Sequence, residues 1–212
     1  MTSHTTAQTQ NLTRNRALPL PAGTWAFDPF HSAVGFTIRH LGIAKVRGRF
    51  NQLDASLVVG DTLESSSVSA TVALDSVDTG NADRDAHVRA SDLLDVAKRP
   101  TMTFRSTRIE GAGEDWTLAG DLTIGDVTRP IRFAVEFGGL VESPVDGATH
   151  AGFEATGELR RSEYGLDFAP GLLGEVVKIV LDVQFVAPAA ARSPAEAQAD
   201  PASDPAASAA AK

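Results

Sequence analysis

The stretch IRFAVEF, from Ile131 to Phe137, alternates apolar and polar residues without a break. The run before it, WTLAGDLTI from Trp116 to Ile124, follows the same two-residue period. Successive side chains of a β-strand point to opposite faces, so each run predicts a strand with one apolar and one polar face. Antiparallel sheets allow this arrangement, whereas parallel sheets are covered on both faces. A sheet that closes into a barrel can bury all of its apolar faces together.

Similar runs recur along the chain and are separated by Gly-Asp and Gly-rich turn sequences. The predicted strands are Thr24–Phe27, Ala33–His40, Arg49–Val59, Val68–Val77, Thr101–Ile109, Trp116–Ile124, Arg129–Phe137, Phe153–Arg160 and Val176–Val186. The first of these can simply continue into the second, which leaves about eight strands. We therefore predict an all-β fold, an eight-stranded antiparallel barrel.

One segment, Asn81–Lys98, breaks this alternation and is rich in Asp, Ala and Arg. Asn81 can cap a first helical turn, and Ser91 or Asp92 can cap a second. The segment also carries a few apolar residues, namely Val88, Leu93, Leu94 and Val96. We predict a short helical insert that covers one end of the barrel.

Composition divides the chain into three parts. Residues 1–22 are polar and unpatterned, and residues 188–212 are mostly Ala, Pro, Ser, Asp and Glu, so we predict a disordered leader and a disordered tail around a barrel domain at 23–187. No secretory signal and no apolar run of about 20 residues is visible, so we expect no integral membrane segment and a cytoplasmic protein.

Charge and composition exclude several function classes. The formal net charge of −8 argues against a nucleic-acid partner and disfavours electrostatic attachment to anionic lipid. The absence of cysteine excludes thiolate catalysis and thiolate metal sites. The histidines show no HxH or HExxH spacing, so we predict no metal site and no cofactor. No nucleophile or dinucleotide motif is present either, and we predict no catalytic residue.

The parity of each run assigns an inward face, and this face mixes large residues with small ones such as Gly120, Gly157, Ala70 and Ala155. An eight-stranded barrel is just wide enough to be filled by side chains or to hold one small ligand. The small inward residues favour an internal space. A fully packed core without a ligand is the alternative.

Two polar residues share the inward parity. His40 follows Val34, Phe36 and Ile38, and its imidazole can hydrogen-bond a ligand head group, although a neighbour in the core is the more common partner of such a histidine. His31 lies an odd number of residues away, which argues against a metal ion shared with His40. Arg161 requires either an anionic ligand group or an acidic partner, and an ion pair with Glu163, Asp167 or Glu175 is favoured.

Four motifs, in order, are similar to the YceI family of lipocalin-like polyisoprenoid-binding proteins. They are FDPFHSAVGFTIRHLGIAKVRGRF at 27–50, DTGNADRDAHVRASDLLDVAKRPTMTF at 78–104, GDLTIGDVTRPIRFAVEF at 120–137 and RRSEYGL at 160–166. The last resembles the R-S-D-F-G element of the family, with Glu and Tyr in place of Asp and Phe. The resemblance implies an eight-stranded lipocalin-like barrel with a long apolar channel for isoprenoid chains, isoprenoid quinones or fatty amphiphiles.

Carried onto this sequence, the resemblance and the inward parity give one set of candidate ligand-binding residues. They are Val34, Phe36, Ile38, His40, Val72, Leu74, Met102, Phe104, Leu118, Leu122, Ile131, Phe133, Val135 and Arg161. We expect a non-enzymatic protein that binds, stores or transports an isoprenoid or related amphiphilic lipid. The alternatives are an enzyme acting on a bound lipophilic metabolite, with His40 or Arg161 as catalyst, and a ligand-free interaction module. An unpaired barrel edge also predicts a homodimer.

Overall fold

The structure, a computed structural model, describes residues 19–188. Eleven strands form one sheet within this part of the chain. They are β1 (Gly23–Phe27), β2 (Ala33–His40), β3 (Ala44–Phe50), β4 (Leu53–Val59), β5 (Ser67–Ala73), β6 (Val77–Asp78), β7 (Thr101–Ala112), β8 (Asp115–Ile124), β9 (Val127–Glu142), β10 (Thr149–Arg160) and β11 (Leu173–Val186). The helical elements are α1 (Ala82–Arg89) and the 3-10 turns η1 (Pro29–His31), η2 (Leu74–Ser76) and η3 (Arg161–Tyr164).

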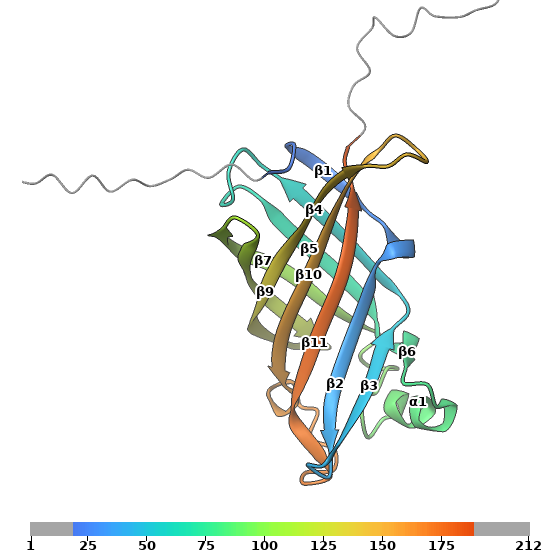
Figure 1. The fold of residues 1–212 in the computed structure, drawn as a ribbon. Helices are drawn as coiled ribbons and strands as arrows, with labels where there is room; N and C mark the ends of the chain where they lie inside the picture. Colours follow the sequence, from blue (N-terminus) through green and yellow to red (C-terminus); the bar gives the residue numbers. More distant parts are fainter. Residues whose placement is uncertain (1–18, 189–212) are drawn as a thin grey trace, which may run out of the picture.

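The sheet closes into an eight-stranded antiparallel barrel, as predicted (Figure 1). The pairs β1/β2, β3/β4 and β5/β6 each follow one course along the wall, interrupted by a short break. The last strand, β11, closes the barrel because it pairs with β10 on one side and with both β1 and β2 on the other. Each course of the described wall thus has a neighbour on both sides, although β6 itself pairs only with β3. The homodimer remains a prediction.

The strand predicted over Arg49–Val59 is in fact two strands. β3 pairs with β2 and β6, whereas β4 pairs with β1 and β5. Between them the backbone amides of Asn51 and Gln52 donate to the carbonyl and the hydroxyl of Ser76, both at 3.1 Å. These hydrogen bonds to η2 replace the ladder at that point. The inward side chains change parity there, from the even positions Val46 and Phe50 in β3 to the odd positions Leu53, Leu57 and Val59 in β4.

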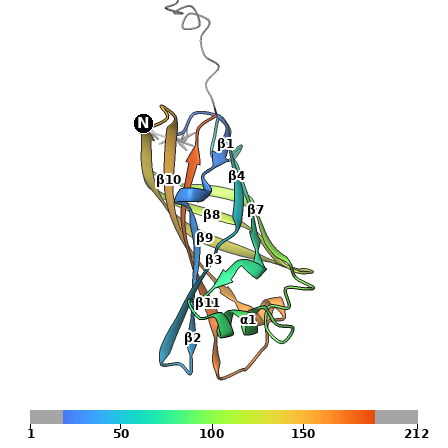
Figure 2. The same cartoon turned by 90° about the vertical axis from the view of Figure 1, so that its right-hand side faces the viewer.

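The helical insert lies at one end of the barrel (Figure 2). As predicted, Asn81 caps α1, and its side-chain oxygen accepts the amide of Arg84 at 2.9 Å. The second predicted helix, at Ser91 or Asp92, is wrong, because the chain after α1 forms successive turns. Asp95 adopts a left-handed φ of 48° in these turns, a conformation that cannot be propagated as a right-handed helix.

Aromatic side chains pack the opposite end of the interior. Trp116 stacks on Phe137 with ring centroids 5.4 Å apart, and Phe153 and Phe185 extend the same cluster. Trp25 is completely buried beside them. Leu20 is buried in the same cluster, so packing includes part of the predicted leader. The rest of that leader and nearly all of the predicted tail lie outside the described residues.

A second aromatic pair fills the middle of the barrel. The rings of Phe104 and Phe133 meet edge to face, with centroids 5.6 Å apart. A Cβ on Gly120 would lie 2.4 Å from the Phe104 ring, and a Cβ on Gly157 would lie 2.6 Å from the Phe133 ring. The interpretation of these two glycines as internal space is therefore wrong, because each makes room for a phenyl ring from a neighbouring strand.

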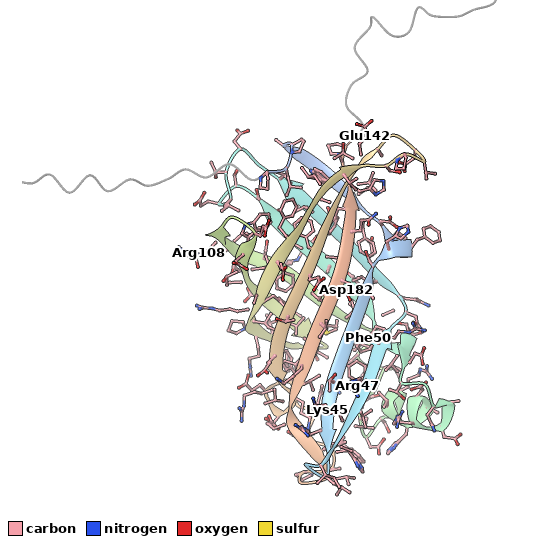
Figure 3. The ribbon with its side chains drawn as sticks, viewed as in Figure 1. Lys45, Arg47, Phe50, Arg108, Glu142 and Asp182 are labelled. Carbon is pink, nitrogen blue, oxygen red and sulfur yellow. The ribbon has the colours of Figure 1, made fainter. Side chains whose placement is uncertain are left out.

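The outer face of the wall is polar, as the alternation predicts. Asp182 of β11 and Lys45 and Arg47 of β3 are exposed and extend from the strands into solvent (Figure 3). Most of the apolar residues of the same strands are buried or half-buried in the interior, although Val180 of β11 is 44% exposed. This separation of faces accounts for a sheet that can close without exposing its apolar side.

We predict that Gly157→Ala destabilises the barrel by about 1–3 kcal/mol, because the added methyl group overlaps the Phe133 ring. Gly152→Ala on the same strand is the matched control, since a Cβ there has no heavy atom within 4 Å. Urea unfolding of both variants measures the difference. Equal stability of the two would contradict the close packing of Phe133 on Gly157.

We also predict a delayed phenol titration. Tyr164 is the sole tyrosine of the chain and is buried, and burial raises its pKa to about 12. Because the unfolded phenol ionises near 10, the stability that this group contributes is complete below about pH 10 and is lost as the pH rises toward 12. Near-ultraviolet absorbance follows the ionisation directly. A midpoint equal to that of the denatured chain would show that Tyr164 is solvated.

Candidate ligand-binding site

An apolar cavity of about 410 Å³ occupies the interior at the α1 end. Its walls come mainly from β2, β3 and β11, from α1 and the turns that follow it, and from the segment that connects β10 to β11. The lining residues contributed by the strands and η2 include Val34, Phe36, Ile38, Val46, Phe50, Leu74, Met102, Ile124, Leu159, Val177 and Ile179. The rest of the apolar lining consists of Val77, Val88, Leu93, Leu94, Leu166, Phe168, Leu172 and Leu173. The polar lining residues are His40, Thr79, Arg84, His87 and Arg161.

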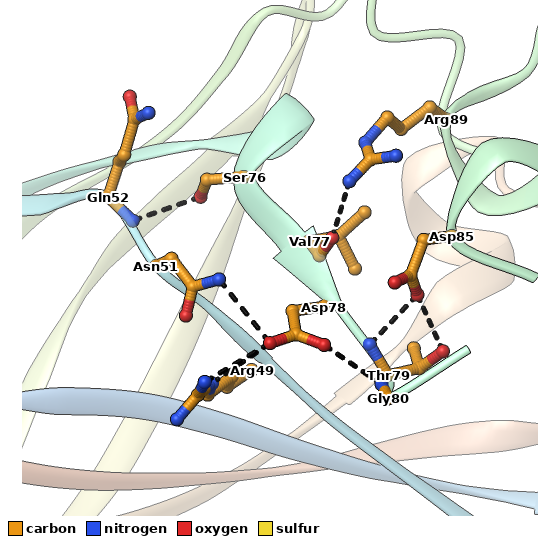
Figure 4. Close-up of polar contacts among 10 residues, drawn as sticks. All are labelled: Arg49, Asn51, Gln52, Ser76, Val77, Asp78, Thr79, Gly80, Asp85 and Arg89. Carbon is orange, nitrogen blue, oxygen red and sulfur yellow. Dashed lines mark hydrogen bonds and ion pairs between the residues drawn. The ribbon is translucent and has the colours of Figure 1, made fainter. Parts of the chain in front are cut away.

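Hydrogen bonds to the chain around β6 hold α1 over this cavity (Figure 4). The buried carboxylate of Asp85 accepts the backbone amide of Thr79 at 2.8 Å and its hydroxyl at 2.6 Å. The guanidinium of Arg89 donates to the carbonyl oxygens of Asp75 at 2.7 Å and Val77 at 2.8 Å. Since both ends of α1 are attached to the wall, the helix is a fixed part of the lining.

Arg161 organises the segment between β10 and β11. Its side chain is buried, and its Nε and Nη2 donate to the carbonyl oxygens of Gly174 at 3.0 Å and Leu173 at 3.4 Å. Nη1 donates to the carbonyl oxygen of Leu166. The predicted ion pair is wrong, because these acceptors are backbone carbonyls and Glu175 instead accepts the amide and hydroxyl of Ser162. Hydrogen bonds to carbonyls satisfy the guanidinium in place of a carboxylate.

Two aromatic rings are in contact at the surface near this end of the cavity. His87 of α1 meets Phe168 edge to face, with ring centroids 5.3 Å apart. On its other side Nε2 of His87 lies 3.0 Å from a carboxylate oxygen of Asp92. That hydrogen bond holds the pKa of Asp92 below its ordinary value. Both side chains of this hydrogen bond are about half exposed, so the cavity lining reaches solvent here.

His40 lies on the cavity wall at the end of β2. Among residues 19–188 its imidazole has no hydrogen-bond partner, although its backbone carbonyl accepts the amide of Ile43 at 3.2 Å. The expectation of a neighbouring protein partner is therefore not met within the described chain. His31 is elsewhere, bonded through Nδ1 to Asp28 at 2.8 Å.

Half of the predicted ligand-binding residues line this cavity. They are Val34, Phe36, Ile38, His40, Leu74, Met102 and Arg161. The other half do not line it and pack in the core or against it. They are Val72, Phe104, Leu118, Leu122, Ile131, Phe133 and Val135. The cavity therefore differs from the long channel that the resemblance implies, because the Phe104–Phe133 pair lies in the middle of the barrel.

The prediction missed the contribution of the β10–β11 segment. Leu166, Phe168, Leu172 and Leu173 all line the cavity, yet none lies in a run with strand alternation. The available signal is four large apolar residues within a short stretch bounded by Gly165 and Gly174. Such a density is unusual for a solvated loop, since connecting segments are mostly polar.

Between residues 19 and 188 no helix combines the length and apolar character needed to cross a bilayer. In the same part of the chain no group of three or more His, Asp or Glu side chains is arranged to hold a metal ion.

The closed antiparallel wall and its internal apolar cavity define a lipocalin-like barrel protein. The model of the YceI-like domain matches residues 25–185, which is nearly the whole described structure. The chain belongs to the YceI family.

Relatives and solved structures agree with this assignment. UPF0312 protein PA0423 of Pseudomonas aeruginosa is 35% identical over 155 residues, which cover 73% of this chain and 81% of that protein. The crystal structure of a YceI protein from Campylobacter jejuni is 27% identical, with a TM-score of 0.63 over 71% of this chain and 90% of that one. A polyisoprenoid binding domain from Saccharophagus degradans shares the fold at 16% identity, with a TM-score of 0.59 over 79% of this chain and 100% of that domain.

We predict that Arg161→Met destabilises the protein by about 2–4 kcal/mol, because three partly buried carbonyl oxygens lose this donor. Arg160→Met is the matched control, since Arg160 is exposed. Its Nε lies 3.9 Å from a carboxylate oxygen of Glu163, which makes a weak ion pair. Denaturant unfolding of both variants measures the difference. A loss for Arg161→Met no larger than for the control would show that the guanidinium does not hold the segment.

Proposed function

We propose that this protein binds an isoprenoid or a related amphiphilic lipid, such as an isoprenoid quinone or a polyprenyl compound, and stores or transports it without chemical change. The observation that carries the proposal is the apolar cavity at the α1 end, of about 410 Å³, lined by aliphatic and phenyl side chains with few polar groups. The polyisoprenoid binding domain of Saccharophagus degradans, which shares this fold, supports the same ligand class.

The size of the cavity constrains the ligand. Sites for small molecules occupy about 300–1,000 Å³, so this cavity encloses a ligand portion of ordinary metabolite size. A long polyprenyl chain would have to extend through the surface at α1, whereas a short prenyl tail would be enclosed. Each buried methylene contributes about 0.8 kcal/mol, less the cost of ordering the chain, so affinity depends mainly on the length that fits.

The polar lining residues favour binding over chemistry. Arg161 donates to three backbone carbonyls, and Arg84 donates to Thr79 at 2.7 and 2.8 Å, so both guanidinium groups are engaged with the protein. His40 is free within the described chain and lies in the cavity. One imidazole can orient a head group by a single hydrogen bond, whereas general acid–base chemistry usually relies on a positioned partner.

We predict that Val177→Phe lowers the affinity for a prenyl probe such as farnesol at least about tenfold, because the added ring takes up cavity volume. Val180→Phe is the matched control on the same strand, since Val180 is 44% exposed and does not line the cavity. Titration with farnesol and thermal unfolding of each variant give affinity and stability. Equal affinities in two folded variants would contradict binding in this cavity.

The ligand class is tested by native mass spectrometry of protein purified without detergent, followed by organic extraction. A stoichiometric prenyl or other long-chain amphiphile is the expected result. Protein that carries no such compound and fails to bind farnesol, geranylgeraniol and a short-chain ubiquinone would overturn the proposal.

A further inference from the structure

The β2–β3 hairpin ends in an apolar tip beside the cavity. Leu41 is 55% exposed and Ile43 is 82% exposed, and they flank Gly42 at the turn. The amide of Leu41 donates to the carbonyl of Leu172 at 2.7 Å, and Leu172 is itself a half-exposed lining residue of the cavity. Apolar surface therefore continues from the tip of the hairpin to the cavity.

The backbone conformation at this tip is unfavourable for the leucine that occupies it. Leu41 has a left-handed φ of 53°, a conformation that favours glycine or asparagine. A leucine there costs conformational energy and exposes a large side chain, and neither property stabilises the barrel. A strained residue of this kind is expected where the exposed side chain has a function of its own.

The strands behind the tip are basic. Residues 33–50 contain Arg39, Lys45, Arg47 and Arg49 and no Asp or Glu, although the whole chain carries a net charge of −8. Arg39 lies directly opposite Lys45 across the two strands, and Arg47 lies opposite Thr37. Lys45 and Arg47 extend outward from β3 (Figure 3). Like charges directly opposite each other destabilise a sheet, so this arrangement serves something other than the fold.

Most of these charges have no acidic partner. Arg49 pairs with Asp78 at 3.2 Å. Arg39, Lys45 and Arg47 form no ion pair with any of residues 19–188. An exposed apolar tip with unpaired cations behind it is complementary to a bilayer, in which anionic head groups lie above an apolar interior.

The opposite end of the barrel provides an internal comparison. The β9–β10 hairpin also exposes apolar residues, with Val141 at 62% and Val145 at 94%. There, however, the neighbouring charged residues are Glu142 and Asp146. The net charge of the chain thus conceals an asymmetry, because the tip beside the cavity is basic and the remote tip is acidic.

We infer that the β2–β3 hairpin docks on the surface of an anionic lipid bilayer, with Leu41 and Ile43 inserted among the acyl chains and Arg39, Lys45 and Arg47 on the lipid phosphates. This docking would place the cavity end of the barrel against the membrane. The inference goes beyond the proposed function and stands on the hairpin alone, so it does not require the cavity ligand to be an isoprenoid.

The test is flotation of the full chain with vesicles of phosphatidylglycerol and phosphatidylcholine, compared with vesicles of phosphatidylcholine alone. We expect binding to the anionic vesicles that weakens as salt is added, since salt screens exposed charges. Arg39→Gln, Lys45→Gln and Arg47→Gln together should lower the partition coefficient by about 100-fold, or roughly fivefold per charge. Arg105→Gln, Arg129→Gln and Arg132→Gln, on the outer faces of β7 and β9, form a control with the same change in net charge.

A second variant separates docking from folding. Leu41→Gly with Ile43→Ser removes the apolar tip and relieves the left-handed φ at position 41, so stability should not fall on that account. We expect at least about tenfold weaker vesicle binding. Val145→Ser, at the acidic tip, should leave binding unchanged. Farnesol titration without vesicles reports the cavity independently.

Three results would overturn the inference. They are an absence of binding of the natural chain to anionic vesicles, equal binding to both vesicle types, and equal losses in the hairpin and control charge variants. If the natural chain binds anionic vesicles but does not bind farnesol, the result counts against the proposed function and supports docking.

Discussion

The interior width of an eight-stranded closed wall is the constraint on which the rest of this structure depends. Eight strands enclose a space that side chains can just fill, so residue size at each level decides between core and cavity. Here the Phe104–Phe133 pair fills the middle of the barrel, seated on Gly120 and Gly157. Tryptophan and phenylalanine pack one side of this pair, and mostly aliphatic residues surround a cavity on the other.

Alternation in the sequence predicts the wall well because side-chain direction in a strand is a local property. It predicts which side of the wall a residue faces, but not at which level of the barrel the residue lies. Phe36 and Phe133 each face inward from their own strands, yet Phe36 lines the cavity and Phe133 fills the middle of the barrel. The level depends on the stagger between distant strands, which no single run contains. The same limit explains Gly157, whose neighbour is known only once β9 and β10 are in register.

The site depends on contacts that carry little sequence information. Arg161 was placed inward from its parity, but its partners are carbonyl oxygens, which every residue possesses. Residue type alone therefore favours a carboxylate partner, which the structure does not have at this position. The folding of the β10–β11 segment over the cavity follows from those hydrogen bonds, and with it come Phe168 and Leu172 as lining residues. Side chains that hold backbone carbonyls are the hardest part of such a site to predict from sequence.

The two ends of the barrel differ in packing, and the hairpin tips at these ends differ in charge. At the end filled by aromatic rings, the exposed apolar residue Val145 has acidic neighbours. At the end with the cavity, the exposed apolar residue Ile43 has basic neighbours. An amphiphile that leaves a bilayer loses least free energy when its chain passes directly between apolar environments, because each methylene exposed to water costs about 0.8 kcal/mol. A cavity that reaches the surface beside an apolar, basic tip meets this requirement. The −8 net charge is compatible with it, because electrostatic attraction at a membrane decays within a Debye length of about 8 Å and depends on the charges nearest the lipid.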